Sequence, residues 1–409
     1  MDQHHSSADE RRVVVTGLGV VSPYGPGCEV YWQGLAQGQC LIGPLDLFPT
    51  DGFRSCIAAE VRATTMRALG TARQSRATRF LLAAAREAVE NAGLDALALT
   101  TAAVSIGGAG GGMLGAEEWY WAHYHHSQSP HRQVALLRAM LPANQTDALA
   151  FHLRIGGPRE SPILACSSSA AAIATITDLI ETGVVDVGLA GGVDTLTRLC
   201  FMGFNALKLL DPQPCRPFAR DRRGMSLGEG AAVLVLESWQ HAVARGARLR
   251  ACVAGCGLSS DAFHPTAPPA DAEGAVRAMR EALVRADLRP ADITYINAHG
   301  TGTAQNDRAE AVALAEVFGP GNVLVSSTKS LIGHAMGAAG ALEAVATISA
   351  LETGLLPPTA NLCEPDPSIP FDCIPHTARP ATLACAMSNS FGFGGQNVSV
   401  IFLRPDMAG

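Results

Sequence analysis

Cys166 stands at a position in the sequence where a cysteine could act as a nucleophile. Residues 161–165, S-P-I-L-A, predict a short strand, and residues 167–181 have helical spacing up to a closing glycine, Gly183. A cysteine between a strand and a helix lies at the positive end of the helix dipole, which stabilises a thiolate and leaves the backbone N–H free. We therefore expect Cys166 to be reactive, whereas a structural role is the default for the other ten cysteines.

Three polar segments in the second half of the chain supply the partners that such a nucleophile needs. Acyl chemistry at a thiol requires groups that move protons or hold developing negative charge. The segments are N-A-H-G-T-G-T at 297–303, V-S-S-T-K-S-L-I-G-H at 325–334 and S-N-S-F-G-F-G-G-Q-N at 388–397. Taken singly, His299 could be a capped structural histidine, Lys329 a surface charge, and the two phenylalanines ordinary core. No Walker lysine or G-x-G-x-x-G context supports a nucleotide site.

The composition narrows the class of protein. Of 409 residues, 48% are apolar and 5% aromatic, with 42 glycines, which favours an α/β fold with helices packed closely on a buried sheet. The net charge of -7 provides no basic field for nucleic acid. Because the N-terminal segment is polar and no long uncharged apolar run follows, we expect no membrane association and a cytoplasmic protein. The 11 cysteines lack CxxC spacing, which predicts reduced thiols and no metal site.

The two halves of the chain repeat one pattern. Residues 15–22 and 253–260 both read V-x-G-x-G-x-x-S. Helix-like segments at Arg86 and Arg280 both read R-E-A, and each leads into a strand that enters a glycine-containing loop. Two repeated patterns that occur in the same order indicate gene duplication, with residues 1–250 as the N-terminal half and 251–409 as the C-terminal half. Strands separated by helices predict two mostly buried sheets with crossover helices, packed together.

The first half is the longer, so we expect it to carry an insertion. Residues 111–142 are the obvious candidate, and they include the aromatic and histidine-rich run W-Y-W-A-H-Y-H-H at 119–126. These histidines are superficially similar to a metal cluster. We interpret the run instead as a solvated or interface loop with stacked aromatics.

Taken together, the polar and glycine-rich segments resemble the β-ketoacyl synthase family of the thiolase superfamily, in its elongating branch with a Cys-His-His active site. The resemblance extends from Val13 to Phe402 and rests on six ordered motifs. They are V-V-V-T-G-L-G-V-V-S-P at Val13, A-C-S-S-S-A at Ala165, H-G-T-G-T at His299, N-D at Asn306, T-K-S-L-I-G-H-x-x-G-A-A-G at Thr328 and N-S-F-G-F-G-G-x-N at Asn389. The resemblance implies a thiolase fold, in which duplicated α/β halves form a five-layer αβαβα sandwich. It also implies an acyltransferase that condenses a malonyl thioester on acyl carrier protein with a Cys-bound acyl chain, losing carbon dioxide.

The resemblance further implies roles for individual residues. Cys166 matches the nucleophile that takes the acyl chain, and His299 and His334 match the pair that holds the malonyl thioester carbonyl and stabilises the enolate. Lys329 matches a lysine that supports this site, and Glu343 matches a buried carboxylate on the following helix. Because decarboxylation generates a carbanion without a strong base, two neutral imidazoles suffice, and we expect no metal and no bound cofactor.

Other matches concern the last glycine-rich segment and the carrier arm. The backbone N–H groups of the nucleophile and of Phe393 would form the oxyanion hole, and Phe393, with Phe391 and Gly392 beside it, matches the aromatic gate that moves when the acyl chain enters. Thr301 and Thr303 match the threonines that bind the phosphopantetheine arm. A thiolase would need a second catalytic cysteine in the glycine-rich segment, which has none.

The partner that the resemblance implies is the acidic acyl carrier protein, so we expect a local basic patch at the pocket mouth. Arg73, Arg76 and Arg79 recur every three residues and could form that patch, although a solvated helix face is an equally good interpretation. Family members are generally dimers. We therefore expect a homodimer, or a heterodimer with a chain-length-factor-like subunit, with residues 111–142 near the far end of the acyl tunnel.

Three functions remain open at this point. The first is an active elongating synthase of fatty acid synthesis or of a type II polyketide or polyene pathway, and the run at 119–126 favours a specialised pathway. The second is a subunit that is active only with a partner. The third is thiolase-like acyl transfer or thioester hydrolysis at Cys166. The complete set of cysteine, two histidines and lysine favours the first, whereas no motif encodes the acyl chain length.

Overall fold

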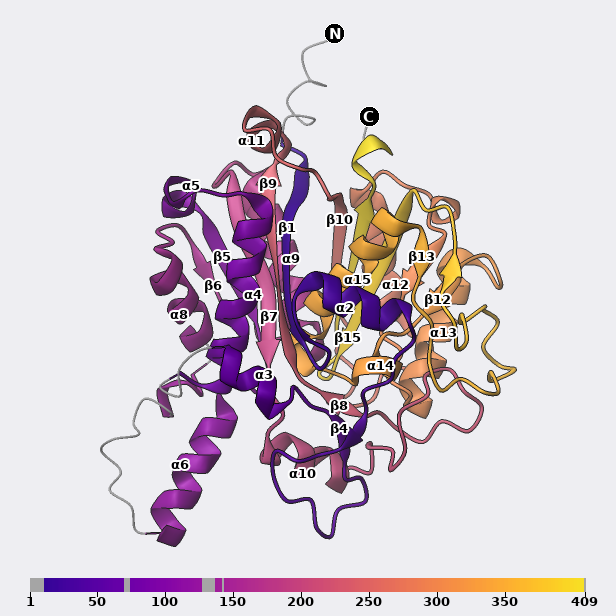
Figure 1. The fold of residues 1–409 in the computed structure, drawn as a ribbon. Helices are drawn as coiled ribbons and strands as arrows, with labels where there is room; N and C mark the ends of the chain where they lie inside the picture. Colours follow the sequence, from indigo (N-terminus) through magenta and orange to yellow (C-terminus); the bar gives the residue numbers. More distant parts are fainter. Residues whose placement is uncertain (1–10, 70–73, 127–136, 142, 408–409) are drawn as a thin grey trace.

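Strands from both halves of the chain join in one central sheet (Figure 1). The computed structural model describes residues 11–69, 74–126, 137–141 and 143–407. The sheet has the order β12-β11-β15-β16-β10-β1-β9-β7-β5-β6, with β2 beside β1. Its strands are β1 (Val13–Ser22), β2 (Gly25–Pro26), β5 (Ala103–Gly107), β6 (Arg159–Glu160), β7 (Val187–Asp194), β9 (Gly230–Ser238), β10 (Ala251–Ser260), β11 (Tyr295–Asn297), β12 (Leu324–Ser326), β15 (Cys385–Gly392) and β16 (Gln396–Leu403). Two small sheets consist of β3 (Gly43–Pro44), β4 (Ile57–Ala59) and β8 (Leu227–Gly228), and of β13 (Leu355–Leu356) and β14 (Arg379–Pro380).

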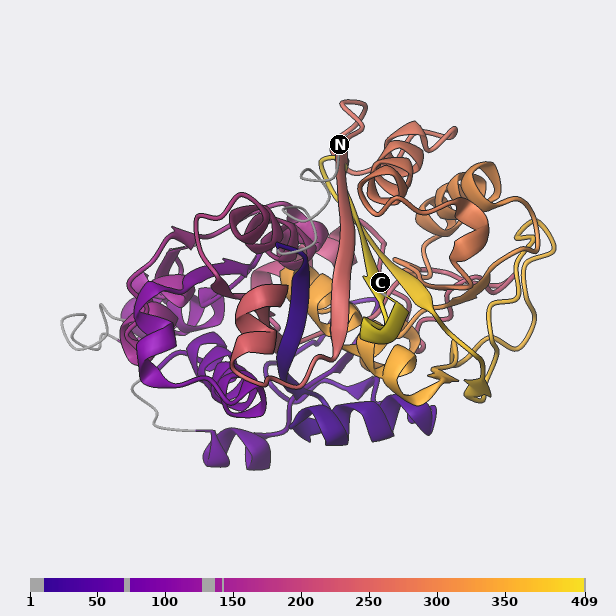
Figure 2. The same ribbon diagram turned by 90° about the horizontal axis from the view of Figure 1, so that it is seen from above.

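The continuous sheet corrects the prediction of two separate sheets. β1 and β10 pair antiparallel, but only over residues 13–15 and 251–253. Each strand is 10 residues long, so beyond this short ladder the two half-sheets part and leave room for helices between them (Figure 2). The halves join because the inner edges of β1 and β10 meet at one end, where unpaired backbone groups would otherwise be buried.

Helices cover the outer faces of the two half-sheets and fill the space between them. α4 and α8 pack on the N-terminal half-sheet, α12 and α13 on the C-terminal one, and α9 and α15 lie between the two. This is the five-layer αβαβα sandwich. The α-helices are α2 (Cys28–Ala36), α3 (Ala63–Ala68), α4 (Arg76–Ala92), α5 (Ala96–Thr101), α6 (Met113–His126), α8 (Ala143–Leu153), α9 (Ser168–Glu181), α10 (Arg198–Ala206), α11 (Trp239–Ala244), α12 (Glu273–Arg285), α13 (Ala304–Phe318), α14 (Lys329–Ile332) and α15 (Ala339–Thr353). The 3-10 turns are η2 (Ala165–Ser167), η3 (Pro290–Asp292), η4 (Met336–Ala338) and η5 (Pro405–Met407). In the described part of the chain, none of the helices has the length and apolar character needed to cross a bilayer.

The repeated V-x-G-x-G motif has a packing reason. A Cβ atom built on Gly17 or Gly19 of β1 would lie 2.1 or 1.9 Å from a carbonyl oxygen of α4. On β10, a Cβ atom at Gly255 or Gly257 would lie 2.4 or 1.9 Å from a carbonyl oxygen of α12. Only glycine allows a helix to lie so close to a strand, so the sequence repeat corresponds to a repeated strand-helix contact. The division of the chain between residues 250 and 251 stays a prediction.

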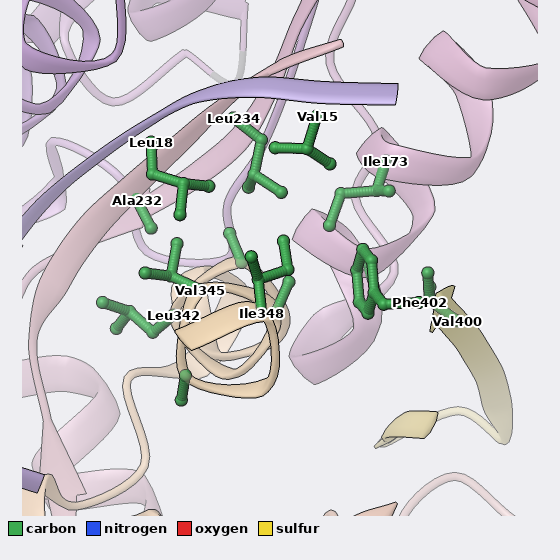
Figure 3. Packing of buried hydrophobic residues seen from close by; sticks show 14 of the residues in the cluster. Val15, Leu18, Ile173, Ala232, Leu234, Leu342, Val345, Ile348, Val400 and Phe402 are labelled. Atoms are coloured by element: carbon green, nitrogen blue, oxygen red, sulfur yellow. The ribbon is translucent and has the colours of Figure 1, made fainter. Parts of the chain in front are cut away.

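The middle helices α9 and α15 form the centre of the core. α15 is buried on all sides over residues 339–351. Figure 3 shows its Leu342, Val345 and Ile348 among side chains of β1 and β9 and Ile173 of α9, all within one cluster. A helix without a polar face is stable here because protein surrounds it. Since both helices begin beside the candidate site, the core fixes the site's position.

The described part of the insertion at 111–142 is largely helical, so the prediction of a loop is wrong. α6 projects from the body of the molecule (Figure 1). The rings of Trp119 and His123 stack with centroids 5.2 Å apart, and those of Tyr120 and Tyr124 lie 4.5 Å apart. Residues four positions apart lie on the same face of a helix. The aromatic rings therefore stack, as predicted, and their contacts stabilise the helix.

The surface position of α6 agrees with a solvated or interface segment. Tyr120, Trp121 and Tyr124 are each more than half exposed. His123 belongs to no group of metal-ligating side chains within the described residues. The side chains of His125 and His126, and residues 127–136 and 142, lie outside the described part. That this segment contacts a second subunit stays a prediction.

Candidate active site

Cys166 lies in the 3-10 turn η2, which leads directly into α9. The helix is where the sequence predicts it, but the strand predicted at 161–165 is wrong. β6 ends at residue 160 and pairs with β5 over only two residues. Pro162 has no N–H with which to continue the ladder, so the chain leaves the sheet before it reaches the cysteine.

Hydrogen bonds hold the turn at Cys166 in a strained conformation. Ala165 has a φ of 48°, which costs an alanine about 1–2 kcal/mol. The N–H of Leu164 donates to Ser168 Oγ at 2.9 Å, and Ser167 Oγ donates to the carbonyl of Leu164 at 2.8 Å. The closed turn places Cys166 in the wall of a pocket that His299 and His334 also line.

The thiol of Cys166 is protonated in the resting protein. Burial raises its pKa to about 11, although the charge of Lys329 and the backbone N–H of Phe393 act in the opposite direction. Cys166 is 5% exposed, and its desolvation outweighs the favourable charges, so the position at the start of a helix does not by itself make the resting thiol a thiolate. A nucleophilic role would therefore require this thiol to lose its proton as it attacks.

His299 follows β11, and a buried carboxylate accepts hydrogen bonds from its backbone N–H and from that of the next residue. Glu310 on α13 accepts the N–H groups of His299 and Gly300, both at 2.8 Å. Lys329 Nζ lies 3.3 Å from His299 Nδ1. A lysine ammonium only donates, so Nδ1 accepts and the imidazole proton is on Nε2.

His334 has the same tautomer for a different reason. The backbone N–H of Met336 donates to His334 Nδ1 at 3.2 Å, so Nε2 carries the proton. His334 Nε2 has no hydrogen-bond partner among the described residues. Burial, followed by the charge of Lys329, holds the pKa of both imidazoles well below its usual range. His299 and His334 are therefore neutral rings with N–H donors on Nε2.

Lys329 forms a buried ion pair with Glu343 of α15. The two residues are 1% and 2% exposed, and Lys329 Nζ donates directly to Glu343 Oε1. Burial raises the pKa of Glu343 to about 7, whereas the charge of Lys329 and its hydrogen bond act in the opposite direction. The pair keeps an ammonium group beside His299, where it opposes protonation of both imidazoles.

Cys166, His299 and His334 meet around one point of the pocket. One polar atom from each side chain lies within 4.8 Å of the others, and the two imidazole centroids are 5.3 Å apart. A thiol and two imidazoles are also a possible ligand set for Zn²⁺. Ligation through Nε2 would require each ring to move its proton to Nδ1, which already accepts from a fixed donor. The tautomers therefore favour binding of an oxyanion over binding of a metal.

The hairpin between β15 and β16 closes the pocket from the opposite side. A Cβ atom at Gly392 would lie 3.3 Å from the backbone nitrogen of Cys166, so the hairpin packs directly on the nucleophile turn. The ring of Phe391 is 6.0 Å from that of His299, and the N–H of Phe393 is directed at the Cys166 sulfur. All three hairpin residues line the pocket. The predicted gate segment is thus in place beside the thiol.

Thr301 and Thr303 line the same pocket. Their hydroxyl oxygens lie 2.9 Å apart, and Thr303 N–H donates to Thr301 Oγ1 at 3.3 Å. Asp307, from the N-D motif, accepts the N–H of Gly302 at 3.1 Å and so fixes the loop. The structure therefore brings together the residues predicted as nucleophile, histidine pair, lysine, gate and threonines.

The predicted docking arginines do not form a free patch. Arg73 lies outside the described residues. Arg76 has a side chain only 11% exposed and is paired with the buried Glu229. Arg79 donates to the carbonyl of Met66 at 3.1 Å, and burial lowers its pKa. The prediction is wrong for Arg76, because this side chain neutralises a buried carboxylate.

Two buried carboxylates that position the site are missed by the sequence reasoning. Glu310 holds the backbone at His299, and Asp194 accepts four backbone N–H groups from loops around the pocket. The sequence contains a pattern that could have identified both carboxylates. Asp194 ends the apolar run of β7, and Glu310 lies within the mostly apolar buried face of α13. An isolated acid in such a position needs several donors to remain buried.

Solved structures similar to this chain include ketosynthases. The ishigamide ketosynthase/chain length factor matches with a TM-score of 0.91 and 37% identity, covering 96% of this chain and 99% of that chain. A type II PKS acyl-carrier protein in complex with its ketosynthase, AntDE:AntF, matches with a TM-score of 0.88 and 29% identity, over 96% and 99%. The ketosynthase ApeO in complex with its chain length factor ApeC from Xenorhabdus doucetiae gives 0.82 and 31%, over 98% and 100%. Fold and site together define a thiolase-fold acyltransferase.

Family models and related sequences show to which family of thiolase-fold acyltransferases the chain belongs. The models for the Beta-ketoacyl synthase N-terminal and C-terminal domains match residues 10–242 and 250–363. Nodulation protein E of Rhizobium sp. (strain N33) is 38% identical over 403 residues, covering 96% of this chain and 99% of the relative. 3-Oxoacyl-[acyl-carrier-protein] synthase 2 of Synechocystis sp. is 36% identical over 415 residues, covering 98% and 99%. The chain belongs to the β-ketoacyl synthase family.

Proposed function

We propose that the protein is an elongating β-ketoacyl-acyl carrier protein synthase that condenses a malonyl thioester with an acyl chain held on Cys166. The observation that supports this best is the shared tautomer of the two histidines. Each Nδ1 atom accepts a fixed donor, so each Nε2 atom carries a proton, and the two rings meet Cys166 in the pocket. Two neutral donors that converge on one point match the charge that develops when a malonyl thioester loses carbon dioxide.

The first step transfers the acyl chain to Cys166. The sulfur attacks the carbonyl carbon of the acyl thioester, and the proton of the thiol passes to the departing sulfur of the carrier arm. One thioester is exchanged for another, so no further base is consumed. The N–H groups of Cys166 and Phe393 hold the oxyanion of the tetrahedral intermediate.

The second step forms the carbon–carbon bond. The thioester carbonyl of the malonyl group accepts from Nε2–H of His299 and His334, and loss of carbon dioxide leaves an enolate oxygen held by these donors. The α-carbon then attacks the acyl carbonyl on Cys166, and the sulfur leaves as a thiolate that takes a proton from water. We propose that neither step uses a metal or a bound cofactor.

The test of this function separates the two steps. His334→Asn keeps an N–H donor at a less suitable position, so we expect condensation to fall about tenfold while acylation of Cys166 is unchanged. Acylation is followed by intact mass of the enzyme, and condensation by the mass of the extended carrier product together with release of labelled carbon dioxide. His152→Asn, at an exposed histidine whose ring contacts Arg86, is the matched control and should leave both steps unchanged. Equal loss of both steps in His334→Asn would show that the imidazole does not act on the malonyl group.

We further propose acyl carrier protein as the substrate carrier, in fatty acid or type II polyketide or polyene synthesis. The exposed aromatic face of α6 supports a specialised pathway. Two of the similar structures pair a ketosynthase with a chain length factor, which supports a second candidate, a subunit that is active only with such a partner. A cytoplasmic location stays a prediction.

Lys208 is the group through which we propose that the acidic carrier docks. It is one of two lysines in the chain, and the other, Lys329, is buried in the site. Lys208 is exposed and lies between Phe204 and Leu209, which both line the pocket. Arg54 Nη1 donates to the carbonyl of Lys208 at 2.9 Å, so a second exposed cation lies beside it. This pair replaces the arginines predicted from the sequence as the basic patch at the mouth.

Charge reversal at Lys208 is expected to weaken carrier binding without changing the chemistry. Lys208→Glu should raise KM for the acyl carrier about tenfold at low salt and leave kcat within about twofold. Carbodiimide cross-linking should join the wild-type chain to the carrier through Lys208. Arg404→Glu is the control, because it makes the same charge change at the residue that follows β16. The C-terminus lies at the other end of the molecule from α10 in Figure 1. A fall in kcat with an unchanged KM would contradict a docking role.

A further inference from the structure

The carboxylate of Asp194 is buried beside the site but takes no part in the two steps above. Asp194 ends β7 and is 1% exposed. Its Oδ1 accepts the N–H groups of Gly110 and Gly111 at 2.6 Å, and its Oδ2 accepts those of Ala109 and Gly337 at 2.8 and 2.6 Å. Burial raises the pKa of this carboxyl to about 6, whereas the N–H groups act in the opposite direction, so it is ionised at neutral pH.

These four N–H groups belong to two different loops of the site. Residues 108–111 follow β5 and lie behind the nucleophile, since a Cβ atom at Gly107 would be 2.3 Å from the backbone of Ser168. Gly337 belongs to η4, the turn that follows His334. A Cβ atom at Gly337 would lie 2.6 Å from Gly108, so the two loops pack backbone against backbone. One carboxylate therefore ties the loop behind the thiol to the loop that carries an imidazole.

The bond to Gly337 controls the turn that sets the tautomer of His334. Met336 donates its N–H to His334 Nδ1 and has a φ of 50°, a conformation that is strained for methionine. The next N–H along the chain, that of Gly337, is the one held by Asp194. If this bond were lost, the strained peptide would relax and its N–H would leave the imidazole.

We propose that Asp194 is a positioning residue for decarboxylation, which keeps the N–H of Met336 on Nδ1 of His334 and thereby keeps the imidazole proton on Nε2. The inference rests on the proposed function, in which that Nε2–H holds the enolate. Asp194 itself touches no substrate. Because acyl transfer to Cys166 does not use the His334 donor, the second step depends on Asp194 more strongly than the first.

Two substitutions test this role. Asp194→Asn keeps the size of the side chain but sets an NH₂ donor against backbone donors, and Asp194→Ser leaves room for a water that accepts some of the same N–H groups. We expect carbon dioxide release from the acylated enzyme to fall about tenfold or more, with Cys166 acylation within about twofold of wild type. In ¹⁵N spectra of histidine-labelled protein, assigned with His334→Ala, the His334 signal should change from the Nε2–H tautomer to a mixture.

Glu87→Gln is the matched control. Glu87 also accepts backbone bonds, from Val20 at 2.8 Å and Cys28 at 2.7 Å, and it takes no part in the active site. It should lower thermal stability while leaving both steps and the His334 spectrum unchanged. Equal loss of both steps in the Asp194 variants, or an unchanged His334 tautomer, would overturn the inference. Wild-type protein that releases no carbon dioxide would instead refute the proposed function, so the two failures are distinguishable.

Discussion

Replacement of Cys166 by alanine is expected to abolish acyl transfer and condensation entirely. Without the sulfur no acyl-enzyme can form, so the intact mass of Cys166→Ala should show no adduct with any acyl carrier. The two imidazoles and Lys329 remain in place, so slow carbon dioxide release from the malonyl carrier should persist. Because alanine is close to cysteine in volume, we expect the variant to remain folded, which thermal unfolding will show.

The control for this result is a cysteine that lies on the surface. Cys363 is exposed, and Cys363→Ala should retain full acylation and condensation. An acyl adduct that survives in Cys166→Ala would place the nucleophile elsewhere. Loss of the adduct in Cys363→Ala would likewise show that Cys166 is not the nucleophile.

Replacement of Lys329 by methionine is expected to damage both activity and stability. The change removes the donor to His299 Nδ1 and the positive charge that keeps both imidazoles neutral, so condensation should fall by about 10²–10³. It also leaves Glu343 buried without its partner, which costs about 3–5 kcal/mol of unfolding free energy when the carboxylate is ionised.

The stability loss in Lys329→Met should depend on pH in a defined direction. The pKa of Glu343 is already raised to about 7, and loss of the ammonium raises it further. A carboxyl group with a raised pKa binds its proton in the folded state, so stability falls as pH rises from the unfolded pKa through the folded one. Urea unfolding should therefore show a larger deficit at pH 8 than at pH 6.

A double variant separates the two effects of Lys329. Lys329→Met/Glu343→Gln removes both buried charges, so it should regain most of the lost stability and none of the lost activity. Recovery of condensation in the double variant would mean that the lysine acts only through the fold. A loss in Lys329→Met that is the same at pH 6 and pH 8 would mean that Glu343 is not charged in the folded protein.

The parts of the fold that depend on local sequence patterns could be predicted. The glycine repeat at Gly17 and Gly255 marks close contacts of a strand with a helix, and these contacts are short in sequence and strict in their steric demand. The polar segments around His299 and His334 were recognisable because buried polar residues in apolar surroundings need a reason. The helix after Cys166 followed from regular spacing.

The remaining features depend on contacts between distant parts of the chain. The partner of Arg76 is Glu229, 153 residues away, so its spacing to neighbouring arginines could not show that it is buried. The pKa of Cys166 is set mainly by burial, which the helix dipole argument does not include. The joining of the half-sheets depends on three residue pairs between β1 and β10. Asp194 could be noticed as an isolated acid, but the two loops that it joins are visible only in the folded chain.

The most direct test of decarboxylative condensation at Cys166 is an intact-mass time course of the purified protein. It is mixed first with an acyl carrier and then with a malonyl carrier, while carbon dioxide is collected. We predict an acyl adduct on Cys166, followed by its loss together with one equivalent of carbon dioxide and a carrier product extended by two carbons. Loss of the adduct as free acid, or chain extension from an acetyl thioester without carbon dioxide, would contradict this function.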